Sequence, residues 1–326
     1  MRTSPRLSPP EIQDEYLFYD DIHPTTAMHR QIANYISHHL NLGSAAQDLF
    51  LVTDAALFFD DRFGFGAPIL ETGESNLQVT TIHGENESGP RRRQTSGIRA
   101  DLDHRLNENF TLGGEFIYAD GQSRSSDFES YGIGIDLIHR GPWKEFAYEI
   151  GLGGGYLWGD LTRDYDPGSF SSESDQMAST VSIHGALRDP ALNVGGLKGY
   201  WEIELKHRFV FRGHSTESGA SSLDLEYHSE TLSTTVANLE IGLHLCPNLD
   251  LAVSLNPVLF HEGGEISSRQ ESGLAEFNTP DGSGYDVHTG RVSLIYRPSD
   301  SASIAADLVV GSEDTWSGQL SFGLRF

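Results

Sequence analysis

Segment 315–326, at the C-terminal end of the chain, alternates strictly between apolar and polar positions. One parity holds Trp316, Gly318, Leu320, Phe322, Leu324 and Phe326, and the other holds Thr315, Ser317, Gln319, Ser321, Gly323 and Arg325. Successive side chains of a β-strand point to opposite faces. The pattern therefore predicts a strand with one apolar and one polar face that ends at the final phenylalanine.

The same alternation returns many times upstream. Apolar rows with period two occur around residues 98–104, 131–137, 146–152, 201–211, 239–245 and 249–259, the last broken at Pro257. From about residue 76 onward there are about twelve such segments, each close to the ~10 residues that a tilted membrane-spanning strand needs. The repetition predicts a large antiparallel sheet.

The connections between these segments differ in length in a regular way. Tight connections are expected at 106–109, 140–143, 246–248 and 297–300, and long polar ones at 121–128, 160–176, 213–230 and 262–284. A membrane barrel has short turns at one end and longer loops at the other. A connection at 188–198 is longer than a tight turn and fits this rule less well.

The polar faces carry charges of both signs, for example Arg99, Asp101, Glu202 and Lys206. Each would cost several kcal/mol in a dry core unless it were paired, whereas a hydrated lumen accepts them. Aromatic residues lie mostly near strand ends, as in the girdles of membrane barrels. The sequence predicts an all-β, 12-stranded antiparallel transmembrane barrel. The alternative is an ordinary soluble all-β domain.

Composition narrows the possible partners. The 326 residues include 47 acidic and 22 basic side chains, which gives a net charge of −25 and a pI near 4.7. This balance excludes nucleic acid as a partner, because nucleic-acid binding needs a basic footprint. The mean hydropathy of −0.35 and the lack of a long apolar run exclude a helical membrane span. A single cysteine, Cys246, excludes an internal disulfide.

An acidic stretch lies in the expected long connection at 160–176 and contains Asp160, Asp164, Asp166, Glu173 and Asp175. It could bind calcium, but it lacks the residue spacing of a known calcium loop. Solvated acidic residues are the favoured interpretation. The sequence predicts no cofactor and no metal site.

The N-terminal segment 11–42 has a different pattern. A short aromatic strand is followed by a turn, and a helix is expected to begin at Thr25 or Thr26, which are good N-cap residues. Its apolar residues Ile32, Tyr35, Ile36 and Leu40 recur at helical spacing, and Gly43 ends it. No secretion signal precedes this segment in the sequence, because the residues after Arg6 do not form an apolar core.

Asp20 and His23 lie three residues apart in the turn before that helix. This spacing lets the carboxylate accept a hydrogen bond from one imidazole nitrogen and leaves the other free to take a proton from a serine. The string Tyr-Asp-Asp-Ile-His-Pro-Thr-Thr-Ala-Met-His at 19–29 resembles the last conserved block of the GDSL esterases (SGNH hydrolases). By that resemblance His23 is the general base and Asp20 orients it.

The rest of that family's catalytic machinery is missing from the sequence. The family needs a Gly-Asp-Ser nucleophile block upstream, with a glycine and an asparagine for the oxyanion hole. No Gly-Asp-Ser and no Gly-x-Ser-x-Gly motif occurs in the chain. Whether this chain is an enzyme is therefore uncertain, and His23 and Asp20 are vestigial unless an upstream serine is supplied.

An esterase end block followed by a barrel that ends in phenylalanine resembles the autotransporter esterases of Gram-negative bacteria (type V secretion). The resemblance implies an esterase passenger remnant at 1–43, a linker at 44–70 that crosses the lumen as a helix, and a translocator barrel at 71–326. It also implies an outer-membrane location with the N-terminal segment outside. Outer-membrane lipid and, through the Phe326 strand, the barrel-assembly machinery are the expected partners.

Three functions remain open at this point. The first is a translocator barrel with a truncated, inactive passenger. The second is a working surface esterase or lipase, acting on an ester substrate, whose N-terminal part is missing from this sequence. The third is a stand-alone outer-membrane pore or adhesin. All three contain the barrel.

Overall fold

The computed structural model of the chain describes His29 and residues 70–86, 93–123, 126–165, 170–219, 225–227, 230–263, 265–270, 276–280, 288–312 and 315–326. From residue 70 onward the described residues form β-strands and the turns between them. Among the described residues, no helix is both long and apolar enough to cross a membrane.

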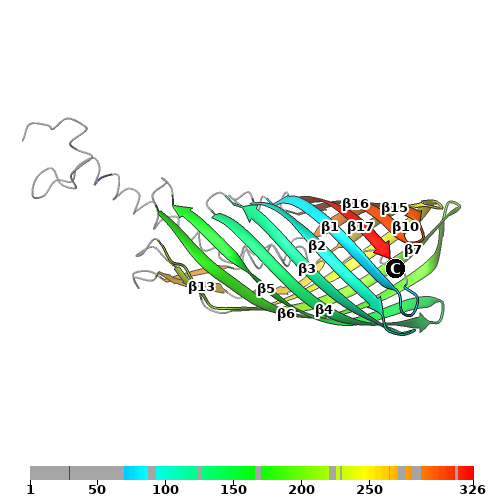
Figure 1. The fold of residues 1–326 in the computed structure, drawn as a ribbon, viewed down its shortest axis with the longest axis horizontal. Helices are drawn as coiled ribbons and strands as arrows, with labels where there is room; N and C mark the ends of the chain where they lie inside the picture. The colour runs from blue at the N-terminus through cyan, green and yellow to red at the C-terminus, as the bar shows by residue number, and fades with distance from the viewer. Residues whose placement is uncertain are drawn as a thin grey trace, which may run out of the picture.

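Antiparallel strands close into a barrel (Figure 1). Each strand of the wall pairs with its neighbours in the chain, and β1 pairs with both β2 and the last strand, β17. Both β11 and β12 pair with β10 and are separated only by Pro257, so they are two halves of one strand and the wall has twelve strands. The wall consists of β1 (Ser75–Asn86), β2 (Arg93–Arg105), β3 (Phe110–Gln122), β4 (Ser126–Trp143), β5 (Phe146–Tyr165), β6 (Phe170–Val194), β7 (Leu197–Arg212), β10 (Glu230–Cys246), β11 (Leu249–Asn256), β12 (Val258–Glu262), β15 (Thr289–Ser299), β16 (Ala302–Gly311) and β17 (Trp316–Arg325).

One end of the barrel, here the turn end, carries only short turns. These turns join β2 to β3, β4 to β5, β6 to β7, β10 to β11 and β15 to β16. The first strand begins and the last strand finishes at this same end. The parity of short turns predicted from the sequence is confirmed.

The connection at 188–198 was predicted to be too long for a tight turn, and this prediction is wrong. β6 continues to Val194, and only Gly195 and Gly196 separate it from β7. Both glycines have positive φ, at 60° and 91°, a conformation that glycine adopts without steric cost. A shift of register between Asp189 and Leu192 accommodates Pro190 within the strand.

The opposite end, here the loop end, holds the longer connections, but two of them are shorter than predicted. β4 begins at Ser126, β5 ends at Tyr165, and β6 begins at Phe170. The wall is therefore tallest at β4–β6, where β6 has 25 residues against 10 in β17 (Figure 1). The outward residues at these strand ends are acidic, so the alternation of apolar and polar residues that predicts a strand does not extend to them.

The two remaining long connections form a second sheet beyond the wall. It contains β8 (Ser215–Thr216), β9 (Leu225–Tyr227), β13 (Glu265–Gln270) and β14 (Glu276–Pro280), in the order β14-β13-β9-β8. An isolated bridge between Glu173 and Ser218 joins this sheet to β6. The tall side of the wall thus continues into an extension made by the segments after β7 and β12.

The all-β, twelve-stranded antiparallel barrel is confirmed. The helical N-terminal remnant is not supported by the described residues. His29 alone is described in that segment, as an exposed residue of helical conformation. The rest of 1–43 and all of 44–69 lie outside the described residues.

Candidate functional site

The strands sort their side chains by parity into an outward and an inward set. On β2, Ile98 and Leu102 are nearly half exposed on the outside, whereas Arg99 and Asp101 are buried, 6% exposed, on the inside. On β17, Leu320 and Phe322 face out and Ser317 and Ser321 face in. The charged row predicted from the sequence to line a lumen therefore does so.

Two groups of aromatic side chains bound the outward apolar surface. Near the turn end, His139 lies 4.8 Å from Phe110 and 5.6 Å from Tyr148, measured between ring centroids. Towards the loop end, Tyr131 lies 5.3 Å from Tyr118 and 5.9 Å from Trp158. From Tyr148 to Trp158 the strand advances roughly 33 Å, or roughly 23 Å along the axis of a barrel whose strands tilt by ~45°. This height matches the ~25 Å apolar band of a membrane barrel.

Beyond the loop-end aromatic group, four carboxylates stand in one outward cross-strand row. Asp120 is opposite Glu129, Glu129 is opposite Asp160, and Asp160 is opposite Asp175. Partial burial, a hydrogen bond with Asp175 and the charges of Asp175 and Glu129 raise the pKa of Asp160. Among the described residues, no group of three or more histidine, cysteine or acidic side chains is arranged to hold a metal ion.

The lumen contains a cavity of about 550 Å³ near the turn end. Carboxylates of its wall come from β2, β3, β4, β5 and β7, and basic groups come from β2, β4, β6 and β7. The ionisable groups include Arg99, Asp101, Asp103, Arg105, Glu115, Asp136, Arg140, Glu149, His184, Arg188, Glu202, Glu204 and Lys206. A cavity with both signs of charge suits water and polar or zwitterionic groups rather than an apolar ligand.

Glu149 on β5 connects two neighbouring strands at the floor of this cavity. Its carboxylate accepts a hydrogen bond from Nε of Arg140 on β4 and lies 3.1 Å from Nε2 of His184 on β6. Gly151 lies under the His184 ring, and a Cβ there would come within 2.0 Å of the ring. The contact with Glu149 and the missing side chain at Gly151 let the imidazole lie close against the wall.

A second polar network lies on β6, β7 and β10. The hydroxyl of Tyr200 donates a hydrogen bond of 3.0 Å to the Glu240 carboxylate, and the guanidinium of Arg188 lies 4.2 Å from the centroid of the Tyr200 ring. The Tyr200 ring covers Gly242, where an added Cβ would sit 1.8 Å from the ring. A buried tyrosine with a bonded hydroxyl and a stacked cation is a rigid part of the wall.

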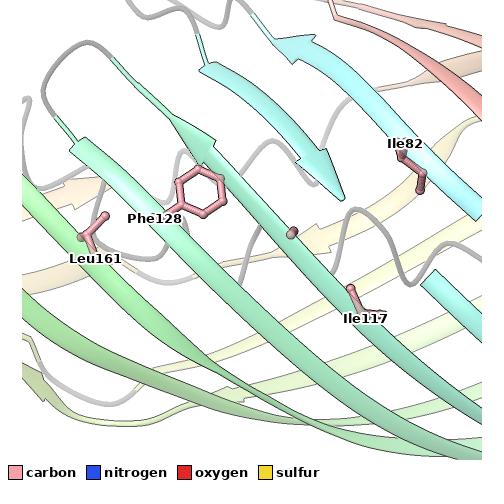
Figure 2. Packing of buried hydrophobic residues seen from close by; sticks show 5 residues of the cluster. Ile82, Ile117, Phe128 and Leu161 are labelled. Carbon is pink, nitrogen blue, oxygen red and sulfur yellow. The ribbon is translucent and has the colours of Figure 1, made fainter. Parts of the chain in front are cut away.

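The loop-end half of the lumen has a different chemistry. Nine inward residues on β1, β3–β7 and β10 are apolar and at most 4% exposed, and we name them the apolar inner surface: Ile82, Ile117, Ala119, Phe128, Leu157, Leu161, Ala178, Val210 and Leu232. Figure 2 shows Ile82 on β1, Ile117 on β3, Phe128 on β4 and Leu161 on β5. Near the loop end, Arg163 forms an ion pair with Glu217, and both side chains are at most 2% exposed. The loop-end half of the lumen therefore combines this apolar surface with buried polar side chains, among them Gln176, Arg208 and Arg212.

The catalytic residues predicted from the sequence, Asp20 and His23, lie outside the described residues. Sequence periodicity located the charged lumen wall but not the apolar inner surface. The sequence does contain a signal for the apolar inner surface, because Ile117, Leu157 and Val210 each lie between two outward aromatic residues. Runs that are apolar at both parities mark places where the inner face is apolar as well.

Comparison with known proteins agrees with this architecture at the level of the fold. The structure is similar to the translocator domain of the autotransporter NalP from Neisseria meningitidis, with a TM-score of 0.59 and 15% identity over 90% of this chain and 98% of that one. It is also similar to the transport unit of the autotransporter AIDA-I from Escherichia coli, with a TM-score of 0.60 and 11% identity over 86% and 98% of the two chains. The β domain of the Bordetella autotransporter BrkA matches with a TM-score of 0.53 and 11% identity, over 77% of this chain and 98% of that one. No protein-family model matches the sequence, and no curated protein matches it either.

Proposed function

We propose that this chain is an outer-membrane translocator barrel that carries the end of a GDSL-type esterase passenger. The observation that carries this proposal is the closed twelve-stranded wall, whose outward surface is an apolar band between two aromatic groups. Lipid satisfies such a surface, and closure leaves no unpaired strand edge in the membrane. The likeness to the NalP and AIDA-I domains, which covers 98% of each of them, supports the translocator assignment.

The orientation follows from the two ends of the barrel. Membrane barrels of this kind place short turns in the periplasm and longer loops outside. The turn end, which includes Phe326, then faces the periplasm, and the C-terminal strand is available to the barrel-assembly machinery. The extension made by β8, β9, β13 and β14 faces the exterior. Segment 44–70 crosses the lumen, so that 1–43 is exposed outside.

A tag at the N-terminus tests the translocator function. The full chain is given a secretion signal and an epitope tag before Met1 and is produced in Gram-negative cells. Antibody should bind the tag on intact cells, and external protease should remove the tag while leaving the barrel. An assembled barrel whose tag is reached only after the cells are opened would overturn the proposal.

The passenger assignment has a separate test. Asp20 and His23 would serve as orienting acid and general base only with a serine from an upstream segment, because the chain has no nucleophile block. The purified chain should hydrolyse a short p-nitrophenyl ester no faster than the His23→Ala variant does. Hydrolysis that is lost in the variant would mean that this chain is itself an esterase.

A stand-alone channel is the second candidate function, and the 550 Å³ charged cavity favours it. The two functions differ in conductance across a planar bilayer. A translocator with an occupied lumen should show little steady current, whereas an open channel should show stable steps at low voltage. Stable steps together with a tag that stays inside the cell would favour the channel.

A further inference from the structure

Two neighbouring cross-strand rows on the outward surface mark a sharp chemical boundary. The outer apolar row takes one residue from each of β2–β6, each opposite the next: Ile98, Tyr118, Tyr131, Trp158 and Met177. Two residues nearer the loop end on each strand, the outer polar row is joined in the same way: Ser96, Asp120, Glu129, Asp160 and Asp175. On β1, His83 lies opposite Ser96, and its Nδ1 is 2.8 Å from the Ser96 hydroxyl oxygen. The apolar outward surface therefore ends between these two rows.

Such a row does not run level around the barrel, because the strands are tilted. Leu192, at the turn end of β6, is opposite Gly199, and the register continues from there through β10, β11, β15, β16, β17 and β1 into the outer apolar row. After one circuit the row returns to β6 at Met177, on the loop-end side. From Leu192 to Met177 the strand advances roughly 50 Å, or roughly 35 Å along the axis, which is roughly 3 Å for each strand of the wall. The loop-end boundary therefore rises by roughly 12 Å from β2 to β6.

The boundary of the apolar surface at the turn end does not show this rise. Phe110 on β3 is opposite His139, and His139 is opposite Ile150 on β5. A boundary along that row would end the apolar surface of β5 at Ile150, but the outward parity continues through Tyr148 to Phe146. These further residues span roughly 9 Å along the axis, which offsets the rise of roughly 6 Å over two strands. The turn-end boundary is therefore close to level, and a simple tilt of the barrel would not align both boundaries with a flat bilayer.

The apolar outward surface is consequently taller on β5 than on β2. On β5 it extends from Phe146 to Trp158, roughly 40 Å along the strand and roughly 28 Å along the axis. On β2 it extends from Leu106, just after the strand, to Ile98, roughly 26 Å along the strand and roughly 19 Å along the axis. A hydrocarbon core of ~30 Å fits the first height but exceeds the second. Beyond Ile98, Ser96 is too short to reach the headgroups as a long charged side chain would.

We propose that the bilayer is thinner beside β1 and β2 than beside β5, and that the difference lies in the leaflet at the loop end. A bilayer thins around an apolar surface that is shorter than its hydrocarbon core. The inference rests on the proposed function, in which the outward surface faces lipid, and it adds that the lipid boundary follows the outer polar row. Because β1 pairs with β17, the thinnest lipid lies beside the junction between the first and last strands.

Depth measurements on the full chain in phosphatidylcholine vesicles test this boundary. In a Cys246→Ser background, Ser96→Cys on β2 is compared with Ile133→Cys on β4. Ile133 lies roughly 9 Å below Glu129 of the outer polar row, and the rise from β2 to β4 leaves it within roughly 3 Å of the height of Ser96. A fluorophore on each cysteine is quenched by lipids brominated near the headgroup or deep in the acyl chain. The label at 133 should lie roughly 9 Å deeper than the label at 96 and be quenched severalfold more by the deep bromines.

A matched pair in the turn-end half provides the control. Leu102→Cys on β2 and Ile150→Cys on β5 are outward positions, 48% and 55% exposed. The row from Leu102 reaches β5 at Gly154, and Ile150 lies roughly 9 Å below Gly154, which cancels the rise over three strands. The two labels should therefore be quenched equally by the deep bromines.

The possible outcomes separate this inference from the proposed function. Equal quenching at 96 and 133, with both control labels in lipid, would overturn the thinning and leave the membrane barrel intact. A difference of the same size in both pairs would indicate a tilted barrel and would also overturn the inference. No quenching at any of the four positions would overturn the proposed function itself. Each variant must first show the heat-dependent gel migration of a folded barrel, and His83→Cys replaces Ser96→Cys if that variant does not assemble.

Discussion

Ser75, the first residue of β1, and Phe326, which follows β17, exchange two backbone hydrogen bonds. The amide of Ser75 donates to the carbonyl oxygen of Phe326 at 2.8 Å, and the amide of Phe326 donates to the carbonyl oxygen of Ser75 at 3.0 Å. The neighbouring side chains of Glu74 and Arg325 approach within 3.4 Å. The final residue thus completes the ladder that closes the wall.

Removal of Phe326 should impair assembly of the barrel. The deletion loses the last pair of β1–β17 hydrogen bonds and one exposed apolar side chain at the turn end. We expect the folded fraction after insertion into lipid vesicles to fall severalfold, as measured by migration of unboiled samples on a gel. The Phe326→Leu control keeps the backbone bonds and an apolar end and should assemble well. Equal assembly of the deletion variant would show that closure does not depend on this residue.

The acidic row outside the barrel should destabilise the protein at neutral pH. Asp160 has a carboxylate directly opposite on both sides, and its pKa is raised above the ordinary value of 3.8. The folded state binds the Asp160 proton more tightly than the unfolded state does. The free energy of unfolding therefore falls as the pH rises from about 3.8 through the raised pKa of Asp160. Asp160→Asn should therefore raise the unfolding free energy at pH 7 by roughly 0.2–1 kcal/mol, and less in high salt.

The comparison of pH values provides the control for that prediction. The gain from Asp160→Asn should disappear well below pH 3.8, where Asp160 is protonated in both states. Asp127→Asn is a matched variant, since Asp127 pairs with the neutral residues Gln122 and Thr162. Urea unfolding of both variants at the two pH values measures the difference. A gain of equal size from Asp127→Asn would attribute the effect to overall charge.

Gly242 should tolerate no side chain. A Cβ at this position would lie 1.8 Å from the ring of Tyr200, which is held by Glu240 and Arg188. Gly242→Ala should lower the unfolding free energy by about 1–3 kcal/mol, the usual cost of overpacking. Gly318→Ala is the control, because nothing lies within 4 Å of its added Cβ. Urea midpoints that drop equally for both variants would trace the loss to backbone propensity instead.

Much of this fold could be predicted from the sequence, because one physical rule acts along the whole wall. Strict alternation, as at Leu320 and Ser321, assigns each side chain to the outer face or to the lumen and so identifies the strands. The rule fails where the environment on one side changes. At Ile117 the inner face becomes apolar, and around Asp160 the outer face becomes acidic beyond the aromatic group, so the alternation of apolar and polar residues is lost there.

Other features depend on backbone geometry that apolar periodicity does not report. The two-residue turn at Gly195 and Gly196 follows from their positive φ, and the strand before it continues past Pro190 through a shift of register. The charged cavity depends on how Glu149, Arg140 and His184 meet across three strands. The sequence predicts that these three side chains point inward, but it does not predict which of them meet, because the turns and bulges of each hairpin set the register.

The central claim is that this chain forms a closed barrel that spans a lipid bilayer. The most direct test is to insert the purified chain into lipid vesicles, wash them with alkaline carbonate, and compare boiled and unboiled samples on the same gel. The account predicts that the chain stays with the vesicles and that the unboiled sample migrates faster as a compact, heat-sensitive species. Release by carbonate together with identical migration of the two samples would contradict it.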